Sequence, residues 1–269
     1  MSAHSGAGGR WSLRVLGLGY IFLLLLLPLG LIFYKTFEDG ISPPIDAITS
    51  PDGLHALKLT LLMVVIAVPL NTIFGVICAL LLVRHKWKGN FVIDAVINLP
   101  FAISPVVIGL SLFLLYGING WFEPGLAEAG IKILFSVPGM VLASVFVSLP
   151  FVVRETVPVL QEIGTEQEQA GQTLGANAWQ VFWRITLPAI RWGVAYGVVL
   201  TTARVLGEFG AVSVVSGSIS GQTQTLPLFV EKQYQNFNLP GAFGASVLLA
   251  LIALATLLAM NLLRRKEAA

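Results

Sequence analysis

Six long apolar segments dominate this chain of 269 residues and restrict what it can fold into. Each is long enough to cross the hydrocarbon core of a bilayer, which takes about 20 helical residues. A segment that crosses lipid must satisfy its backbone polar groups internally, so each is predicted to be helical. We therefore expect an all-α polytopic membrane protein with six transmembrane helices, at 16–34, 57–83, 91–116, 137–161, 189–215 and 242–263.

The composition supports this class. Hydrophobic residues make up 56% of the chain and charged residues 11%, whereas soluble domains carry about 25% charge. The basic residues are dispersed, which argues against a nucleic-acid surface. Cys78 is the only cysteine and the histidines lie far apart, so we expect no metal site.

The expected organisation is one transmembrane domain at 16–263 between two short tails, 1–15 and 264–269. The first apolar run is too long for the core of a signal peptide, so we expect it to remain as the first helix. The longest polar interruption, at 162–188, is expected to be a loop outside the membrane.

Lysine and arginine predict the orientation, because they concentrate in cytoplasmic loops. Eleven lie on the side of the 162–188 loop and four on the other, with Arg204 inside a span and not counted. Both termini and the loop are therefore predicted to be cytoplasmic. The first group is Arg10, Arg14, Arg84, Lys86, Lys88, Arg154, Arg184, Arg191, Arg264, Arg265 and Lys266; the second is Lys35, Lys58, Lys132 and Lys232.

The 162–188 loop carries signals for two short helices joined at a glycine. Thr165 and Glu168 have the spacing of a capping box, and Gly175 can end the first helix by adopting a positive φ. Asn177 is a second N-cap candidate, with Gln180 three residues later.

Trp179, Phe182 and Trp183 follow at helical spacing, so the hairpin should expose an apolar ridge flanked by acids. Such a ridge fits either a groove in a partner protein or the lipid surface, and residue chemistry alone leaves both open.

A spaced motif runs through the same loop: Gln169-Ala170-Gly171, then Gly175, then Ile185-x-Leu187-Pro188. It resembles the EAA loop of ABC-importer permeases, with Gln169 in place of the usual Glu and Gly171 in place of the second Ala. The resemblance implies that this loop docks on a separate ATPase and that these seven residues couple the two proteins.

Arg204 and Glu208 lie four residues apart in the fifth apolar segment, close enough to pair. Intramembrane charges should face protein or water. Two interpretations stay open: a structural ion pair, or a polar position on a conduction pathway that offers a basic group to an anion.

The third apolar segment is interrupted by Pro100 and Pro105, with Ser104 beside them. Proline frees carbonyls and permits a kink, and a helix start exposed at such a break would favour an oxyanion. We list Ser104 and Pro105 as pathway candidates, with simple helix bending as the alternative. The stretch 216–225 is either a flexible linker or a loop at the outer gate that meets a binding protein.

Several segments resemble one family more closely. They are 99–121, 136–160, 185–201 and the stretch around Gly207–Gly217, and they resemble permeases of sulfate and molybdate importers, most closely the CysW-type subunit of sulfate/thiosulfate systems. The resemblance implies a bacterial plasma-membrane complex with a T-type permease subunit, sulfate ABC ATPase subunits and an extracytoplasmic sulfate-binding protein.

It further implies that this chain binds no cofactor, because ATP and Mg²⁺ are used by the partner ATPase. The sequence agrees, since it has no G-x-x-x-x-G-K-[ST] phosphate loop, no H-E-x-x-H and no G-x-S-x-G. We therefore expect no catalytic residues. The alternatives are a molybdate or tungstate permease and an ion-coupled secondary transporter, although a carrier of that kind would not need the capped hairpin.

Overall fold

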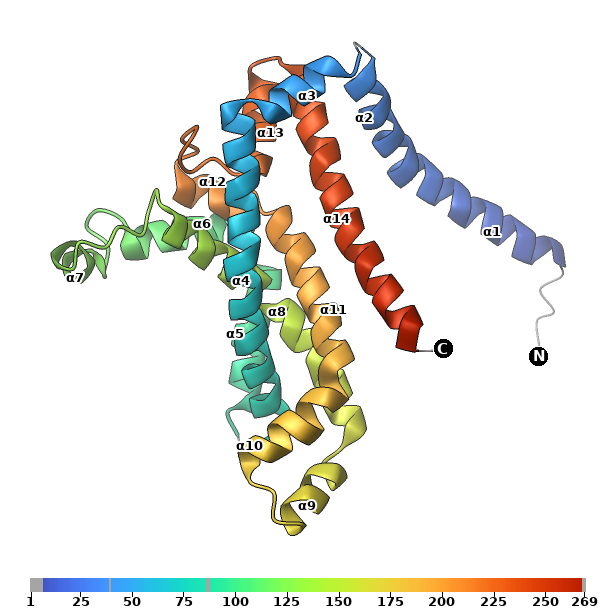
Figure 1. Ribbon diagram of the computed structural model, residues 1–269, viewed down its shortest axis with the longest axis vertical. Coiled ribbons are helices and arrows are strands. Elements are labelled where there is room, and N and C mark those ends of the chain that lie inside the picture. Colours follow the sequence, from blue (N-terminus) through green and yellow to red (C-terminus); the bar gives the residue numbers. More distant parts are fainter. Residues whose placement is uncertain (1–6, 39, 86–87, 268–269) are drawn as a thin grey trace.

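The computed structural model describes residues 7–38, 40–85 and 88–267, and their regular structure is helical (Figure 1). This confirms the all-α prediction. The helices are α1 (Ala7–Ile21), α2 (Leu27–Phe37), α3 (Ser42–Thr49), α4 (Pro51–Arg84), α5 (Asn90–Ala102), α6 (Pro105–Tyr116), α7 (Glu123–Glu128), α8 (Val137–Ile163), α9 (Glu166–Thr173), α10 (Ala178–Val181), α11 (Leu187–Leu206), α12 (Gly210–Ser216), α13 (Leu226–Gln235) and α14 (Leu239–Glu267). Lys86 and parts of the two expected tails, 1–6 and 268–269, lie outside the described residues.

Five helical stretches within the described residues are long and apolar enough to cross a membrane, and a bent pair makes a sixth candidate. The five are Arg14–Phe37, Pro51–Arg84, Val137–Ile163, Ala178–Leu206 and Leu239–Leu258. The predicted third span is the bent pair: α5 and α6 meet at an angle of 111° on either side of Ile103 and Ser104. Pro105 opens α6, where its missing N–H costs no helical hydrogen bond.

The fifth span differs from its predicted bounds of 189–215. Its helix begins earlier, at Ala178, and ends at Leu206, and the residues from Gly210 form the separate helix α12. Gly207 and Gly210 flank the interruption, and glycine weakens a helix interior because its backbone is free to leave the helix.

Two spans contain a single π-helical turn, and each turn comes just before a proline. Phe22–Leu26 joins α1 to α2 ahead of Pro28, and Phe182–Thr186 joins α10 to α11 ahead of Pro188. Proline lacks the N–H and crowds the preceding turn, so a wider turn keeps the helix continuous there.

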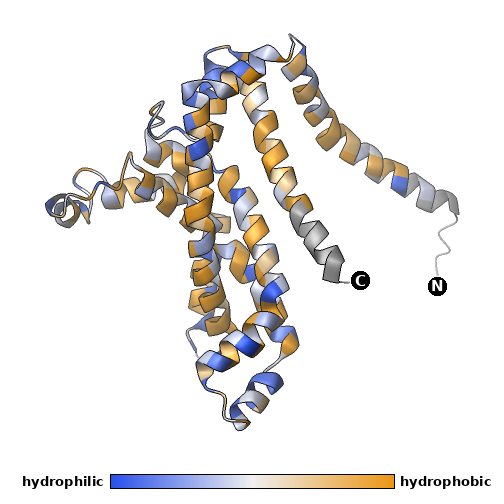
Figure 2. Cartoon of the chain, viewed as in Figure 1, coloured by the Kyte–Doolittle hydropathy of each residue, from blue (hydrophilic) through white to orange (hydrophobic). Residues whose placement is uncertain are grey.

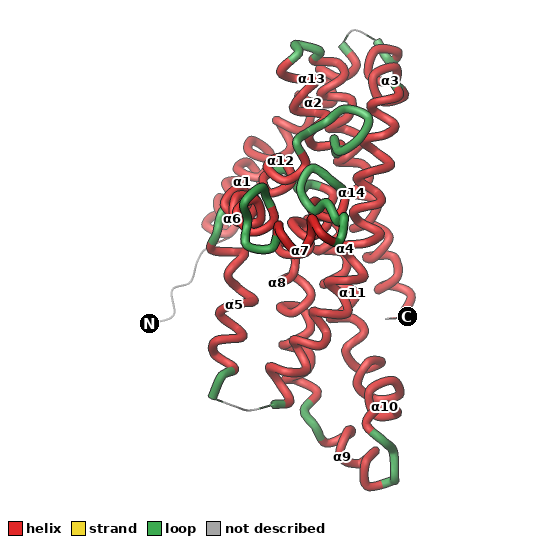
Figure 3. Tube along the Cα trace, turned by 90° about the vertical axis from the view of Figure 1, so that its left-hand side faces the viewer, coloured by secondary structure: helices red, strands yellow, loops and turns green. Residues whose placement is uncertain are grey.

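Helices α4, α8 and α11 form the central bundle (Figures 1 and 3). Both α4 and α11 approach α8 closely at Val152, which is fully buried. A Cβ at Gly75 would lie 2.6 Å from Val152 Cβ, and one at Gly197 would lie 2.7 Å from Val152 Cα. Small residues at such crossings let helix backbones approach closely, as packing within a bilayer favours.

Polar contacts reinforce the same bundle. Asn71 of α4 donates from Nδ2 to Ser148 Oγ of α8 at 2.7 Å, and both residues are buried. Helix α4 runs through Pro69 without a break.

Hydrophilic residues are concentrated toward the two ends of the bundle, although some lie along it (Figure 2). The hairpin of α9 and α10 forms one end, and α3 and α13 lie at the opposite end (Figure 1). The helix of α1 and α2 leans away from the bundle, and its most apolar stretch is 0% buried.

Candidate functional site

The turn between α9 and α10 has the conformation that the sequence predicts, with Gly175 ending the first helix. Gly175 has a φ of +89°, and the N–H groups of Gly175 and Ala176 donate to the carbonyls of Gln172 and Gly171, both at 3.0 Å. These two bonds form a Schellman motif, which satisfies carbonyls that the end of α9 leaves free.

The predicted cap of α10 is also confirmed. Asn177 Oδ1 accepts the N–H of Gln180 at 2.9 Å, and Gln180 Oε1 accepts the N–H of Asn177 at 3.0 Å. This reciprocal capping box fixes the direction in which the chain leaves the turn.

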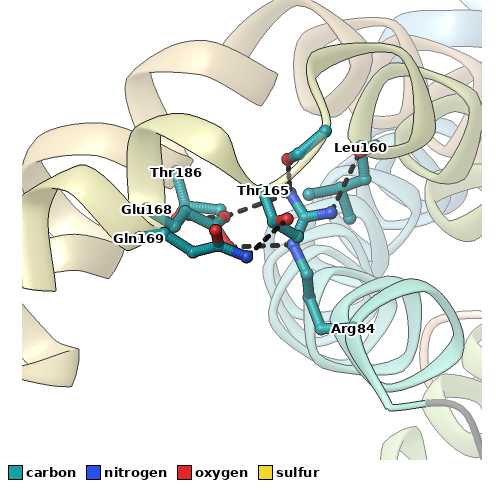
Figure 4. Close-up of polar contacts among 7 residues, drawn as sticks. Arg84, Leu160, Thr165, Glu168, Gln169 and Thr186 are labelled. Carbon is teal, nitrogen blue, oxygen red and sulfur yellow. Dashed lines mark hydrogen bonds and ion pairs between the residues drawn. The ribbon is translucent and has the colours of Figure 1, made fainter.

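The capping box predicted at Thr165 and Glu168 is wrong. Thr165 makes no side-chain cap; its hydroxyl accepts instead from Gln169 Nε2 at 3.1 Å. The Glu168 carboxylate turns away to Arg84, with Nε 3.0 Å from Oε2, and also accepts from Thr186 Oγ1 at 2.8 Å (Figure 4). A charge-assisted bond to a guanidinium is stronger than a neutral cap, so the ion pair prevails.

Arg84 is the residue that sequence reasoning missed. It ends α4, and its guanidinium also donates to the carbonyls of Leu160 at 3.2 Å and Gly164 at 2.7 Å (Figure 4). Gly164 has φ +64° and ψ −158°, a conformation that only glycine adopts readily, and it turns the chain from α8 into α9. One side chain thus joins the ends of α4 and α8 to the start of the hairpin.

Two members of the predicted apolar ridge, Trp179 and Trp183, face outward, whereas the third, Phe182, is half-buried and packs against the core. Leu174 is 89% exposed, Trp179 69% and Trp183 49%, and the two indole rings pack edge to face at 5.5 Å. Bulky apolar groups held rigidly on a polar projection are typical of a protein-docking surface.

The seven predicted coupling residues lie on this hairpin and its return. Gln169, Ala170 and Gly171 are on α9, Gly175 is the turn, Ile185 lies in the π-helical turn, and Leu187 and Pro188 open α11. A Cβ at Gly171 would lie 2.6 Å from Ile185 Cδ1, so the first and last parts of the motif are packed together.

The predicted pair Arg204–Glu208 is confirmed, but the two residues do not share one helix. Arg204 lies in the last turn of α11, and Glu208 lies beyond its end, 2.6 Å from Arg204 Nη1. The other Glu208 oxygen accepts the N–H of Ala211 at 2.9 Å, so the buried carboxylate also caps α12. This gives Glu208 a structural task.

Ser104 and Pro105 lie at the break between α5 and α6, which meets the break between α11 and α12. A Cβ at Gly210 would lie 3.0 Å from Pro105 Cβ, and α6 packs along α12. The four pathway candidates therefore gather around two adjoining helix breaks. Ser104 is exposed and makes no side-chain cap.

The stretch 216–225 is packed against the bundle and does not behave as a free linker. Thr223 Oγ1 donates to the carbonyl of Ser216 at 2.6 Å, and the N–H of Leu226 donates to Thr60 Oγ1 on α4 at 2.8 Å. Thr223, Gln224 and Thr225 are buried.

Comparison with known proteins identifies the family. Residues 71–268 match the family model "Binding-protein-dependent transport system inner membrane component". The chain is 52% identical over 257 residues to the sulfate transport system permease protein CysW of Synechocystis, covering 96% of this chain and 93% of that protein. It is 46% identical over 256 residues to CysW of Escherichia coli, covering 95% and 88%.

It is also 38% identical over 248 residues to the sulfate transport system permease protein CysT of Escherichia coli, covering 92% of this chain and 89% of that protein. Among solved structures, a chain of a bacterial ABC transporter that imports the acidic polysaccharide alginate has the same fold, with a TM-score of 0.81 at 18% identity over 96% of this chain and 95% of that one. This protein therefore belongs to the inner-membrane permeases of binding-protein-dependent transport systems, in the CysW-type branch of that family.

Proposed function

We propose that this chain is the CysW-type permease subunit of an ATP-driven sulfate importer and forms the translocation pathway with a second, CysT-type permease subunit. The observation that carries the proposal is near-full-length identity of 46–52% to CysW proteins, in a chain that presents the capped hairpin of an ABC permease. Thiosulfate, a dianion of similar shape, is included in the proposed cargo.

A permease of this family works with ATPase subunits, a substrate-binding protein and a partner permease. We assign the ATPase contact to the α9–α10 hairpin and therefore place that end of the molecule, with both termini, on the cytoplasmic side of the bacterial inner membrane. The binding protein would then meet the opposite end, where α3, α13 and the packed stretch 216–225 lie. The sulfate ABC ATPase and the sulfate-binding protein are the specific partners proposed.

The hairpin is suited to receive a movement from a partner. Its exposed ridge offers Leu174 and Trp179 to a groove, while Gly175 and the Asn177 cap keep its two helices at a fixed angle. Gln169 stands exposed on α9 and brings an amide where the family motif has a carboxylate, so its contact with the ATPase would be a hydrogen bond without charge.

The connection inward runs through the ion pair at the base of the hairpin. Glu168 on α9 forms an ion pair with Arg84 on α4, and Arg84 donates a hydrogen bond to a carbonyl near the end of α8. When ATP binding draws two ATPase subunits together, the hairpins would be pulled with them and the ends of α4 and α8 would follow. Alternation between inward-open and outward-open arrangements of the two permeases would then pass the anion.

Uptake of radiolabelled sulfate tests this assignment, in cells deleted for the gene with and without its restoration. We expect uptake to return with the gene and to fall when thiosulfate is added in excess. Unchanged sulfate uptake together with a defect in molybdate or tungstate uptake would support the assignment as a permease but contradict sulfate as its substrate. Uptake that persists without any ATPase partner would favour an ion-coupled transporter.

A further inference from the structure

A group of three polar side chains lies on the outer face of α5 and α8: Asp94, Asn98 and Arg154. The orientation prediction counts Arg154 on the side of the 162–188 loop. It lies inside α8, nine residues before the helix ends at Ile163, which is about 13 Å of helix. Its side chain is exposed on a membrane-crossing helix.

The Arg154 side chain is held in a defined orientation. Its Nε donates to Asn98 Oδ1 at 3.0 Å, and its guanidinium carbon lies 4.5 Å from the centre of the Phe101 ring. Asn98 Nδ2 donates in turn to Asp94 Oδ1 at 3.0 Å, so the amide stands between the two charges. Hydrogen bonding at Nε and stacking on one face fix the plane of the guanidinium.

The two terminal nitrogens of Arg154 have no hydrogen-bond partner in the described part of the chain. Arg154 also lines a pocket of about 240 Å³, together with Asp94, Asn98, Val153, Val157 and Pro158. A water molecule takes about 30 Å³ of liquid, so the pocket is large enough for a small oxyanion with part of its hydration. A planar pair of N–H donors matches two oxygens of a tetrahedral anion.

Two other arginines of the membrane-crossing helices already pair with carboxylates. Arg204 pairs with the buried Glu208, and Arg84 pairs with Glu168 and two carbonyls. An exposed arginine facing hydrocarbon is costly, so the α5–α8 face must meet water or protein. Among these three arginines, Arg154 is the one that makes no ion pair with the described residues, so its charge is not offset by a contacting carboxylate.

We propose that the α5–α8 face lines the translocation pathway and that the terminal nitrogens of Arg154 bind the tetrahedral dianion as it crosses. The inference rests on the proposed function. Asp94 lies one turn from Asn98 toward the hairpin end, where its negative charge weakens anion binding. A site that binds weakly enough to release its ion is what conduction requires.

Charge rescue at a cysteine tests the site in the assembled transporter. Arg154→Cys is made in the otherwise unchanged chain, whose single native cysteine, Cys78, is buried. Inside-out vesicles containing the whole complex are treated with methanethiosulfonate reagents carrying a trimethylammonium, a methyl or a sulfonate group. The unmodified chain, treated in the same way, controls for reaction at Cys78, and Arg14→Cys on the α1–α2 helix is the matched loss of an exposed arginine.

We expect Arg154→Cys to lower sulfate transport by about tenfold or more while the ATPase still co-purifies, and Arg14→Cys to stay near the unmodified rate. The cationic reagent should recover a large part of the transport, whereas the methyl and sulfonate reagents should not, and sulfate should slow the labelling. Transport by Arg154→Cys at the full rate would overturn the site. So would a cysteine that resists labelling, or labelling by the cation without recovery, which indicates a structural contact between permeases. Failure of the unmodified chain to transport sulfate would instead overturn the proposed function.

Discussion

Arg84 Nε lies 3.0 Å from Glu168 Oε2, although 84 residues separate the two in the chain. The pair joins the end of a membrane-crossing helix to the first turn of a helix that projects from the bundle. Because Arg84 also holds the carbonyls of Leu160 and Gly164, the hairpin cannot turn against α4 and α8 without loss of several charge-assisted hydrogen bonds.

Replacement of Glu168 by Gln removes the counter-charge and leaves Arg84 with carbonyl partners only. We expect the base of the hairpin to lose about 1–3 kcal/mol of local stability and sulfate transport to fall several-fold. Limited proteolysis of the hairpin and uptake assays would measure the two effects. Glu166→Gln is the matched control, since Glu166 is exposed in the same turn and should leave both unchanged. Equal behaviour of the two variants would contradict the role of the ion pair.

Trp179 is 69% exposed, so its replacement by Ala should cost the isolated permease little stability. If the ridge docks in a groove of the ATPase, loss of the indole should weaken that contact by about 2 kcal/mol or more. Co-purification of the ATPase subunits measures this effect. Phe237→Ala removes an 89% exposed aromatic ring between α13 and α14, far from the hairpin, and should leave co-purification intact. Retention of the ATPase by Trp179→Ala would place the docking surface elsewhere.

Gly175 has open space around the position of a Cβ, so a side chain there is opposed by backbone conformation alone. At φ +89° a residue other than glycine costs about 1–2 kcal/mol, and Asn tolerates the region better than Ala or Val. We expect transport to decline in the order Gly, Asn, Ala, Val. Gly125→Ala in α7 also meets open space but lacks the positive φ, and it should be close to neutral. An equally active Gly175→Val variant would refute the argument.

Arg204 and Glu208 allow the structural and pathway roles to be separated. Arg204→Gln leaves a buried carboxylate without its counter-charge, and we expect a loss of about 3 kcal/mol or more in the stability of the complex. The double variant Arg204→Gln, Glu208→Gln removes both charges and should be less damaging than Arg204→Gln alone. Thermal unfolding of the detergent-solubilised complex measures the difference. A double variant that is stable but does not transport sulfate would indicate that this pair acts in the translocation pathway.

Gly197→Ala would place a Cβ 2.7 Å from Val152 Cα, a backbone atom that cannot move aside cheaply. Overpacking of this kind typically costs about 1–3 kcal/mol, so we expect a lower melting temperature of the complex. Gly30→Ala on α2 meets nothing within 4 Å and should be neutral or slightly stabilising. A melting temperature unchanged by Gly197→Ala would mean that α8 and α11 are less closely packed than the structure has them.

The fold class and the hairpin could be predicted because their signals are local. Hydrophobic length identifies a membrane helix, and Gly175, Asn177 and Gln180 form their turn and cap with near neighbours in the chain. The Thr165 cap was predicted wrongly for the opposite reason. Its intended partner, Glu168, is drawn to a guanidinium 84 residues away, which no local spacing reveals.

The same reasoning applies inside the membrane. The bounds 189–215 follow the apolar run, but the backbone leaves the helix at Leu206 because Glu208 caps a new helix from outside it. The sequence shows that Arg154 lies within an apolar segment. It does not show the contacts of Arg154 with Asn98 and Phe101, which belong to another helix. Only the packing of α5 on α8 brings them together.

The close contacts at Val152 bear on how this chain moves. Because Gly75 of α4 and Gly197 of α11 both pack closely against Val152 of α8, sliding of these helices past one another would require repacking at this buried residue. The three helices would move as one rigid body, and α4 alone, with 34 residues, gives that body a length of about 50 Å. The displacement at the end of the bundle opposite the hairpin would then depend on where this rigid unit rotates against the neighbouring permease. A substitution that moves this rotation axis would change how far the gate opens for each ATP hydrolysed.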